Sequence, residues 1–182
     1  MTRPTRNRLL AVVLVVVTVL VLRRLPDEAT WLVGGAGGAV MALALWVTAP
    51  FRKARGLMRE KKFDEAATEL AAFELSLADG WRKWLAGLAV GLYTTNAIAA
   101  SRNTLGAVRL EQGRLEDATT HFDAAIALDP LYAMPWANRA VLAAMKGDRA
   151  AAMEAKDTAR ALGFGSKTLD AVLHDKLTAR SP

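Results

Sequence analysis

The sequence predicts an all-α protein in which a two-helix transmembrane hairpin is followed by a short domain of helical repeats. Two features indicate this architecture. Residues 1–50 contain two long apolar runs that are flanked by charged residues. In the remainder of the chain, small residues recur at a spacing typical of stacked helix pairs.

The first apolar run is Leu9–Leu22 and the second is Trp31–Ala49. A membrane-spanning helix needs about 20 apolar residues, which the second run reaches. The first run is shorter, at about 21 Å of helix, but its flanking arginines are able to reach outward to the lipid surface. We therefore expect spans at about residues 9–25 and 30–49, within a hairpin anchor of residues 1–50.

A cleaved signal peptide is the alternative for the first run, because arginines precede a short apolar stretch. Against this, no small-x-small cleavage site follows Leu22, and a second apolar run begins almost at once. We favour the hairpin, although it remains open whether the first run is retained as a span. The chain has no cysteine, so disulfide chemistry gives no information on the compartment.

The placement of lysine and arginine predicts the orientation. Three arginines precede the first run, and basic residues dominate 52–62, whereas the connecting loop carries only Arg23 and Arg24. Basic residues are retained on the cytoplasmic side. We expect an integral protein of the plasma or bacterial inner membrane, with both termini and the repeat domain in the cytoplasm. The residues expected to contact lipid head groups are Arg52, Lys53, Arg55 and Arg59.

The second span contains a stripe of small residues, Gly34, Gly38 and Ala42, each four positions from the next. Such a stripe lets another helix approach closely. We favour the first span of the same hairpin as the helix that packs there. A homo-oligomer or a foreign membrane partner is the alternative, since the stripe serves either purpose.

The most informative segment is Leu105–Pro130, LGAVRLEQGRLEDATTHFDAAIALDP. Gly106 suits a close crossing of two helices, Gly113 suits the turn between them, and Ala118 lies on the inner face of the second helix. Pro130 then ends the unit. This spacing resembles the tetratricopeptide repeat (TPR) family, whose helix–turn–helix unit implies a protein-binding scaffold rather than a catalyst.

A shift of 34 residues places Gly113 on Gly147 and Ala118 on Ala152, so the small-residue pattern recurs. A degenerate match also lies upstream, in ARGLMREKKFDEAATEL. We therefore expect a degenerate TPR-like pair at residues 51–80, TPR units at 99–132 and 133–166, and a C-terminal capping helix and tail at 167–182.

Residues 81–98 break the repeat phase, and we expect an extra amphipathic helix there. Trp81, Trp84, Leu85, Leu88 and Leu92 share one helical face. The favoured interpretation is that this face is core, packed on the repeats. An interfacial helix lying on the lipid is the second interpretation, and a third span is the least favoured because polar residues interrupt the segment.

The sequence offers no pattern for catalysis, and we expect no enzyme, cofactor or metal ion. The two histidines lie on separate expected helices, and neither a phosphate-binding loop nor a nucleophile elbow is present. The net charge of +6 is not organised with aromatic residues as a nucleic-acid-binding face, so we expect no nucleic acid.

The expected function is membrane-tethered scaffolding or adaptor work, in which the repeats bind a protein partner while the hairpin lies in the lipid bilayer. The resemblance implies a mostly apolar groove on the first helices, suited to an amphipathic helix or an extended segment. Its expected residues are Asn103, Ala107, Leu110, Met134, Asn138, Val141 and Met145. The alternative is a structural or accessory subunit of a larger membrane complex, which would contact it through the spans and the 81–92 helix.

Overall fold

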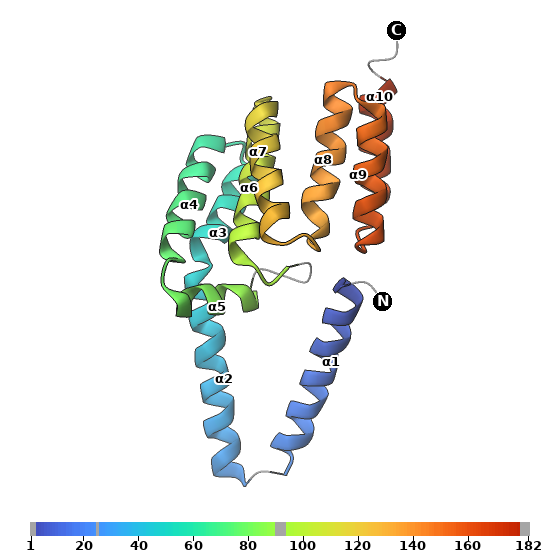
Figure 1. The fold of residues 1–182 in the computed structure, drawn as a ribbon. Coiled ribbons are helices and arrows are strands. Elements are labelled where there is room, and N and C mark those ends of the chain that lie inside the picture. Colours follow the sequence, from blue (N-terminus) through green and yellow to red (C-terminus); the bar gives the residue numbers. More distant parts are fainter. Residues whose placement is uncertain (1–2, 25, 90–93, 179–182) are drawn as a thin grey trace.

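The structure is a computed structural model that describes residues 3–24, 26–89 and 94–178, and over these residues it contains ten α-helices and no strand. The all-α prediction is confirmed. Figure 1 shows α1 and α2 extending away from a body that the other helices form. The helices are α1 (Arg3–Leu22), α2 (Asp27–Val47), α3 (Ala49–Arg59), α4 (Phe63–Ser76), α5 (Gly80–Ala89), α6 (Ala97–Glu111), α7 (Leu115–Leu128), α8 (Ala133–Lys146), α9 (Arg149–Ala161) and α10 (Lys167–Thr178).

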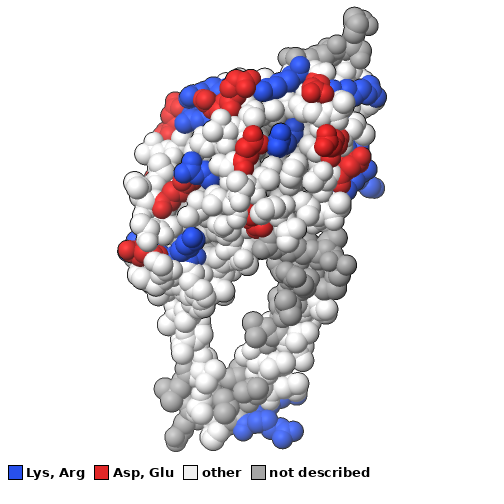
Figure 2. All heavy atoms as spheres, viewed as in Figure 1, with Lys and Arg blue, Asp and Glu red and all other residues white. Residues whose placement is uncertain are grey.

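The expected hairpin takes the form of two helices, α1 and α2, that diverge from their connection as the arms of a V (Figure 1). Large apolar side chains are exposed along both, among them Val15 and Leu20 on α1 and Trp31 and Met41 on α2. Figure 2 shows basic side chains at the tip of the hairpin, and the charged residues in this view otherwise gather on the body. The described parts of the two arms therefore present an apolar surface outward.

No described helix is by itself long and apolar enough to cross a membrane. One bent pair, Val33–Val47 with Ala49–Arg59, satisfies the same criteria of length and composition across a bend of 50°. The bend lies where Thr48 donates its hydroxyl hydrogen bond to the Ala44 carbonyl at 2.8 Å. Arg52 reaches back from α3 to the Leu45 carbonyl at 2.7 Å, which gives an end-of-helix carbonyl a partner.

Three antiparallel helix pairs, α3–α4, α6–α7 and α8–α9, form the body, and all three turn in the same way. The first helix of each pair is followed by a residue with positive φ: Lys61 at 60°, Gly113 at 72° and Gly147 at 84°. The next amide then donates to a carbonyl five residues back, at 2.9 Å in every pair. This is the closure of a Schellman motif, so the pairs share one turn although their sequences differ.

Small residues occupy equivalent positions where the two helices of each pair cross. At Gly106 an added Cβ would lie 2.5 Å from the Phe122 Cε1 atom, so α6 approaches α7 too closely for any side chain there. The close crossing predicted at Gly106 is thus present. The equivalent residues are all buried: Ala54, Gly106 and Ala140 on the first helices, and Ala66, Ala118 and Ala152 on the second.

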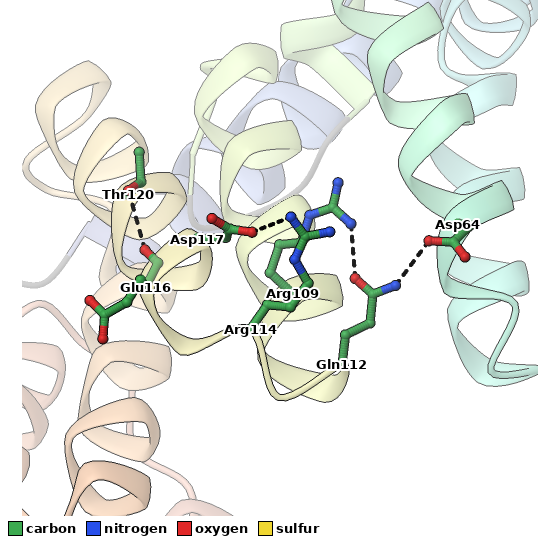
Figure 3. A network of polar contacts seen from close by, with 7 residues as sticks. All are labelled: Asp64, Arg109, Gln112, Arg114, Glu116, Asp117 and Thr120. Carbon is green, nitrogen blue, oxygen red and sulfur yellow. Dashed lines mark hydrogen bonds and ion pairs between the residues drawn. The ribbon is translucent and has the colours of Figure 1, made fainter.

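Neighbouring pairs are joined by equivalent polar contacts at the edge where the turns lie, and Figure 3 shows the contact between the first two pairs. Gln112, at the end of α6, donates to Asp64 at the start of α4, at 3.0 Å, and accepts from Arg109 at 2.8 Å. Lys146, at the end of α8, pairs with Glu116 at the start of α7, at 2.9 Å. The first pair therefore stacks on the second as the second stacks on the third, despite the extra residues between α4 and α6.

The extra segment differs from the expected helix of residues 81–98. The helix is α5, which ends at Ala89, and α6 already begins at Ala97. Between them, Thr94 donates to Asp129 at 2.6 Å, and Asn96 caps α6 by accepting from the Ala99 amide. The connection thus belongs to the packing of α6 and α7 rather than to a continuous helix.

The favoured interpretation of the 81–98 apolar face was wrong in detail. Of the residues expected to be core, Leu85 is buried, whereas Trp81, Trp84 and Leu88 are exposed. Leu92 lies outside the described residues. The side of α5 that packs on the chain is Leu85, Ala86 and Gly87, and both tryptophans of the helix lie on its outer surface.

The last helix of the described chain, α10, packs on the third pair. Leu169 and Leu173 of α10 are buried against the α8–α9 pair. Asp170 of α10, whose side chain keeps 41% of its surface exposed, pairs with Lys156 and Arg160 of α9, at 2.9 and 2.8 Å. Salt bridges therefore join α10 to α9 beside the apolar contact.

Candidate partner-binding surfaces

The residues predicted to line a groove on the first helices lie on α6 and α8, and the structure brings these two helices together. Asn103 and Leu110 are buried. Leu110 packs in a cluster with Phe122 and Leu142, so these side chains stabilise the contact between pairs. The others keep part of their surface exposed: Ala107, Met134, Asn138, Val141 and Met145.

The two asparagines of the predicted groove bond to each other. Asn138 donates its amide hydrogen to the Asn103 side-chain oxygen at 2.8 Å, and the Asn103 amide lies 3.4 Å from the Tyr132 hydroxyl. Burial raises the pKa of Tyr132 above its usual range, while the positive charge of Arg55 acts in the opposite direction. Tyr132 is thus a neutral hydroxyl, and this polar chain fixes α6 against α8.

A second surface, which the sequence analysis did not identify, is a cavity of about 410 Å³ between α7, α8 and α9. Its floor includes Leu142 and Ala155, and charged residues lie among its lining. Such a mixture of apolar floor and polar wall is typical of a binding site. The lining is Thr119, Trp136, Arg139, Leu142, Ala143, Lys146, Asp148, Ala151, Glu154 and Ala155.

The charges of this cavity are already partly paired. Arg139 forms a salt bridge with Asp123 at 3.0 Å and lies over the Trp136 ring, 5.7 Å from its centroid. Lys146 pairs with Glu116. The Trp136 indole nitrogen is buried with no hydrogen-bond partner among the described residues. The cavity depends on the packing of two pairs, which a sequence motif within one unit does not reveal.

The residues of the predicted membrane-packing stripe make no close contact with other helices in the described part of the chain. Gly34, Gly38 and Ala42 are exposed on α2, and a Cβ added at either glycine would meet no described atom within 4 Å. The favoured expectation, that the first span packs against this stripe, is therefore not met by the described residues. The stripe is open to another helix.

The four residues predicted to contact head groups lie on α3, directly after the bend. Arg52 is bonded to the Leu45 carbonyl and to the Thr48 hydroxyl, and Lys53 pairs with Glu69 of α4 at 2.6 Å. The Glu69 partner raises the pKa of Lys53. Arg55 and Arg59 are exposed. All four side chains are thus exposed, and Arg52 and Lys53 also make contacts within the chain.

The described part of the chain contains no group of three or more His, Asp or Glu residues placed to hold a metal ion. His121 lies on α7 and His174 on α10. Burial, together with Arg102 and Arg109, lowers the pKa of His121. No family model matches the sequence, and no curated protein is similar to it.

Proposed function

We propose that this chain is a membrane-tethered scaffold or adaptor, in which TPR-like repeats in the cytoplasm bind a protein partner and the α1–α2 hairpin lies in the bilayer. The observation that carries this proposal is the threefold recurrence of one helix pair. The pairs share their turn, their small crossing residues and their contacts to the next pair. Stacked helix pairs of this kind form extended surfaces that bind other proteins.

The anchor is supported by the exposure of apolar side chains along α1 and α2. Monomeric soluble proteins rarely expose contiguous apolar surface on this scale. Exposed valines and leucines recur along α1, and α2 adds exposed tryptophans at residues 31 and 46, near its two ends. Tryptophans at both ends of an apolar helix suit the two interfaces of a bilayer.

Two surfaces of the repeats are candidates for the partner. The first is the partly exposed side of α6 and α8 that includes Ala107 and Val141. The second is the cavity between α7 and α9, whose wall includes Ala151. Each surface offers apolar contacts beside charged residues, which suits an amphipathic helix or an extended segment.

Three alanine-to-glutamate substitutions distinguish the surfaces. Ala107→Glu blocks the side of α6, Ala151→Glu blocks the cavity, and Ala71→Glu on the exposed side of α4 is the matched control. After crosslinking in intact membranes, we expect one of the first two to lose specific partners that wild type and Ala71→Glu retain. All three chains should keep the same helicity. If every partner is retained in both test variants, the proposed repeat surfaces do not bind them.

A structural or accessory subunit of a larger membrane complex is the second candidate function, because the Gly34–Gly38 surface of α2 is open. A Gly34→Leu, Gly38→Leu variant tests it, since an added Cβ at either position meets no described atom within 4 Å. Loss of partners in this variant, with retention in Ala107→Glu and Ala151→Glu, would place the binding function in the bilayer. Oligomerisation through the same stripe would instead appear as a shift in the mass of the purified protein.

A further inference from the structure

Helix α5 presents a large apolar face outward that no described residue covers. Leu85 and Ala86 are buried against the rest of the chain, whereas Trp84 is 63% exposed and Leu88 is 59% exposed. These exposed side chains lie four residues apart and so share one side of the helix. An outward pair of this kind marks a contact with an apolar surface.

The position of α5 relates this face to the hairpin. Leu85 and Ala86 belong to the same apolar cluster as Ala44 and Val47, in the last turn of α2. Figure 1 shows α5 lying across the direction of α2, at the junction between the hairpin and the body. If α2 runs through a bilayer, α5 therefore lies along the plane of the bilayer at the height where α2 leaves it.

The side chains at this junction combine aromatic rings with positive charge. The Arg82 guanidinium lies 5.2 Å from the Trp46 ring centroid and 5.2 Å from the Trp81 ring centroid. Lys83 is exposed beside it. Indole rings with adjacent lysine and arginine favour the head-group region, where the rings are half buried and the cations meet anionic lipids.

We propose that α5 is an interfacial helix that rests on the bilayer surface through Trp84 and Leu88 and so fixes the orientation of the repeat body. This inference rests on the proposed insertion of α1 and α2. The lipid surface is the occupant that the geometry favours, because Leu45 and Trp46, in the last turn of α2 on which α5 packs, are exposed as Trp84 and Leu88 are. The contact adds a second attachment, so the repeats are held at a defined angle rather than swinging on α2.

The absence of native cysteine makes a direct test simple. Trp84→Cys and Leu88→Cys are each labelled with an environment-sensitive fluorophore in full-length protein reconstituted into phosphatidylcholine–phosphatidylglycerol vesicles. Val40→Cys, on the exposed part of α2, reports insertion of the hairpin. Leu75→Cys, 78% exposed on α4, is the control for an apolar site on the body. Spin-labelled lipids carrying the quencher near the head group or deep in the acyl chain then measure depth.

We expect the Trp84 and Leu88 labels to be quenched at least twofold more strongly by the shallow quencher than by the deep one, and the Leu75 label to be quenched by neither. The label at Val40→Cys should be quenched by the spin-labelled lipids in every experiment, because α2 is inserted. If Val40 is quenched while Trp84 and Leu88 behave as Leu75 does, α5 does not rest on the bilayer, although the hairpin is inserted. Blue-shifted emission at Trp84 without lipid quenching would assign the face to a protein contact and overturn the inference. Loss of Val40 quenching would instead contradict the anchor itself.

Discussion

At the crossing of α6 and α7, Gly106 leaves no room for a methyl group. A Cβ there would lie 2.5 Å from Cε1 and 2.6 Å from Cδ1 of Phe122, whose ring is fully buried. We expect Gly106→Ala to lower the free energy of unfolding by about 1–3 kcal/mol, the usual cost of overpacking a core. Denaturant unfolding of the full chain in detergent, followed by circular dichroism, measures it.

Gly56→Ala is the matched control, because Gly56 lies inside α3 and an added Cβ there meets no described atom within 4 Å. It should raise the free energy of unfolding by about 0.5–1 kcal/mol through helix propensity.

In α3 and α4, the pair equivalent to Gly106 and Phe122 is Ala54 with Leu70, both fully buried. Gly106→Ala with Phe122→Leu copies that pair, so the double variant should be more stable than the sum of its single changes predicts. Simple additivity would mean that the two residues do not compete for space.

Lys61 has φ of 60° at the turn where the other two pairs have glycine. The left-handed conformation costs a non-glycine residue roughly 1–2 kcal/mol. We expect Lys61→Gly to raise the free energy of unfolding by about 1 kcal/mol and the reverse change, Gly113→Lys, to lower it by a similar amount. If both substitutions change the free energy of unfolding in the same direction and by the same amount, the turn does not keep this conformation in solution.

His121 gives the stability a defined pH dependence. Its pKa is lowered, chiefly because burial disfavours the charged imidazolium and also because Arg102 and Arg109 repel it. The unfolded chain therefore binds a proton more readily than the folded chain, and stability falls as the pH drops below the ordinary histidine value of about 6.5. His121→Gln should remove this slope, whereas His174→Gln, on exposed surface, should leave it unchanged. Unfolding midpoints from pH 8 down to pH 5 measure both.

At the scale of elements, the sequence predicted most helices and the turns at Gly113 and Gly147, because helical period and glycine position are local signals. The same signals failed at α5. Amphipathic spacing identified the apolar face of Trp81, Trp84 and Leu88 but not whether protein covers it, since that depends on the neighbouring helix. The turn at Lys61 has no glycine, so composition did not predict its left-handed conformation.

One carboxylate, that of Asp170, joins α10 to two basic residues of α9 beside the apolar contact. The hydrogen bond from Lys156, with the charge of Arg160, lowers the pKa of Asp170. The contribution of Asp170 to the stability of the fold is present above its unfolded pKa of about 3.9. It is lost as the pH falls through the lower pKa of the folded state. Asp170→Asn should therefore speed amide hydrogen exchange in α10 at neutral pH. Asp175→Asn, exposed on the same helix, is the control, and equal exchange in the two variants would mean that apolar contacts alone hold α10.

For the whole molecule, the sequence predicted its segments one at a time, whereas it did not predict how they pack together. Apolar runs and recurring small residues act within a segment, so they indicate an anchor and repeats separately. Three features depend instead on residues from different helices. They are the bend at Thr48, the hydrogen bond from Gln112 to Asp64, and the cavity beside Trp136. Burial of Asn103 and Leu110 likewise follows from the contact of α6 with α8, which is why two of the seven residues expected in the groove are buried.

The orientation of the whole molecule across a membrane is the last prediction. With both termini in the cytoplasm, the connection between α1 and α2 is the only segment between the spans that faces outward. Because the chain lacks cysteine, Pro26→Cys in that connection and Leu75→Cys on α4 provide two exposed reporters. A membrane-impermeant maleimide added to intact cells should label Pro26→Cys at once and Leu75→Cys only after lysis. Labelling of Leu75→Cys in intact cells would place the repeats outside the cell. The basic residues after α2 would then contribute to the repeat body and would not determine the orientation across the membrane.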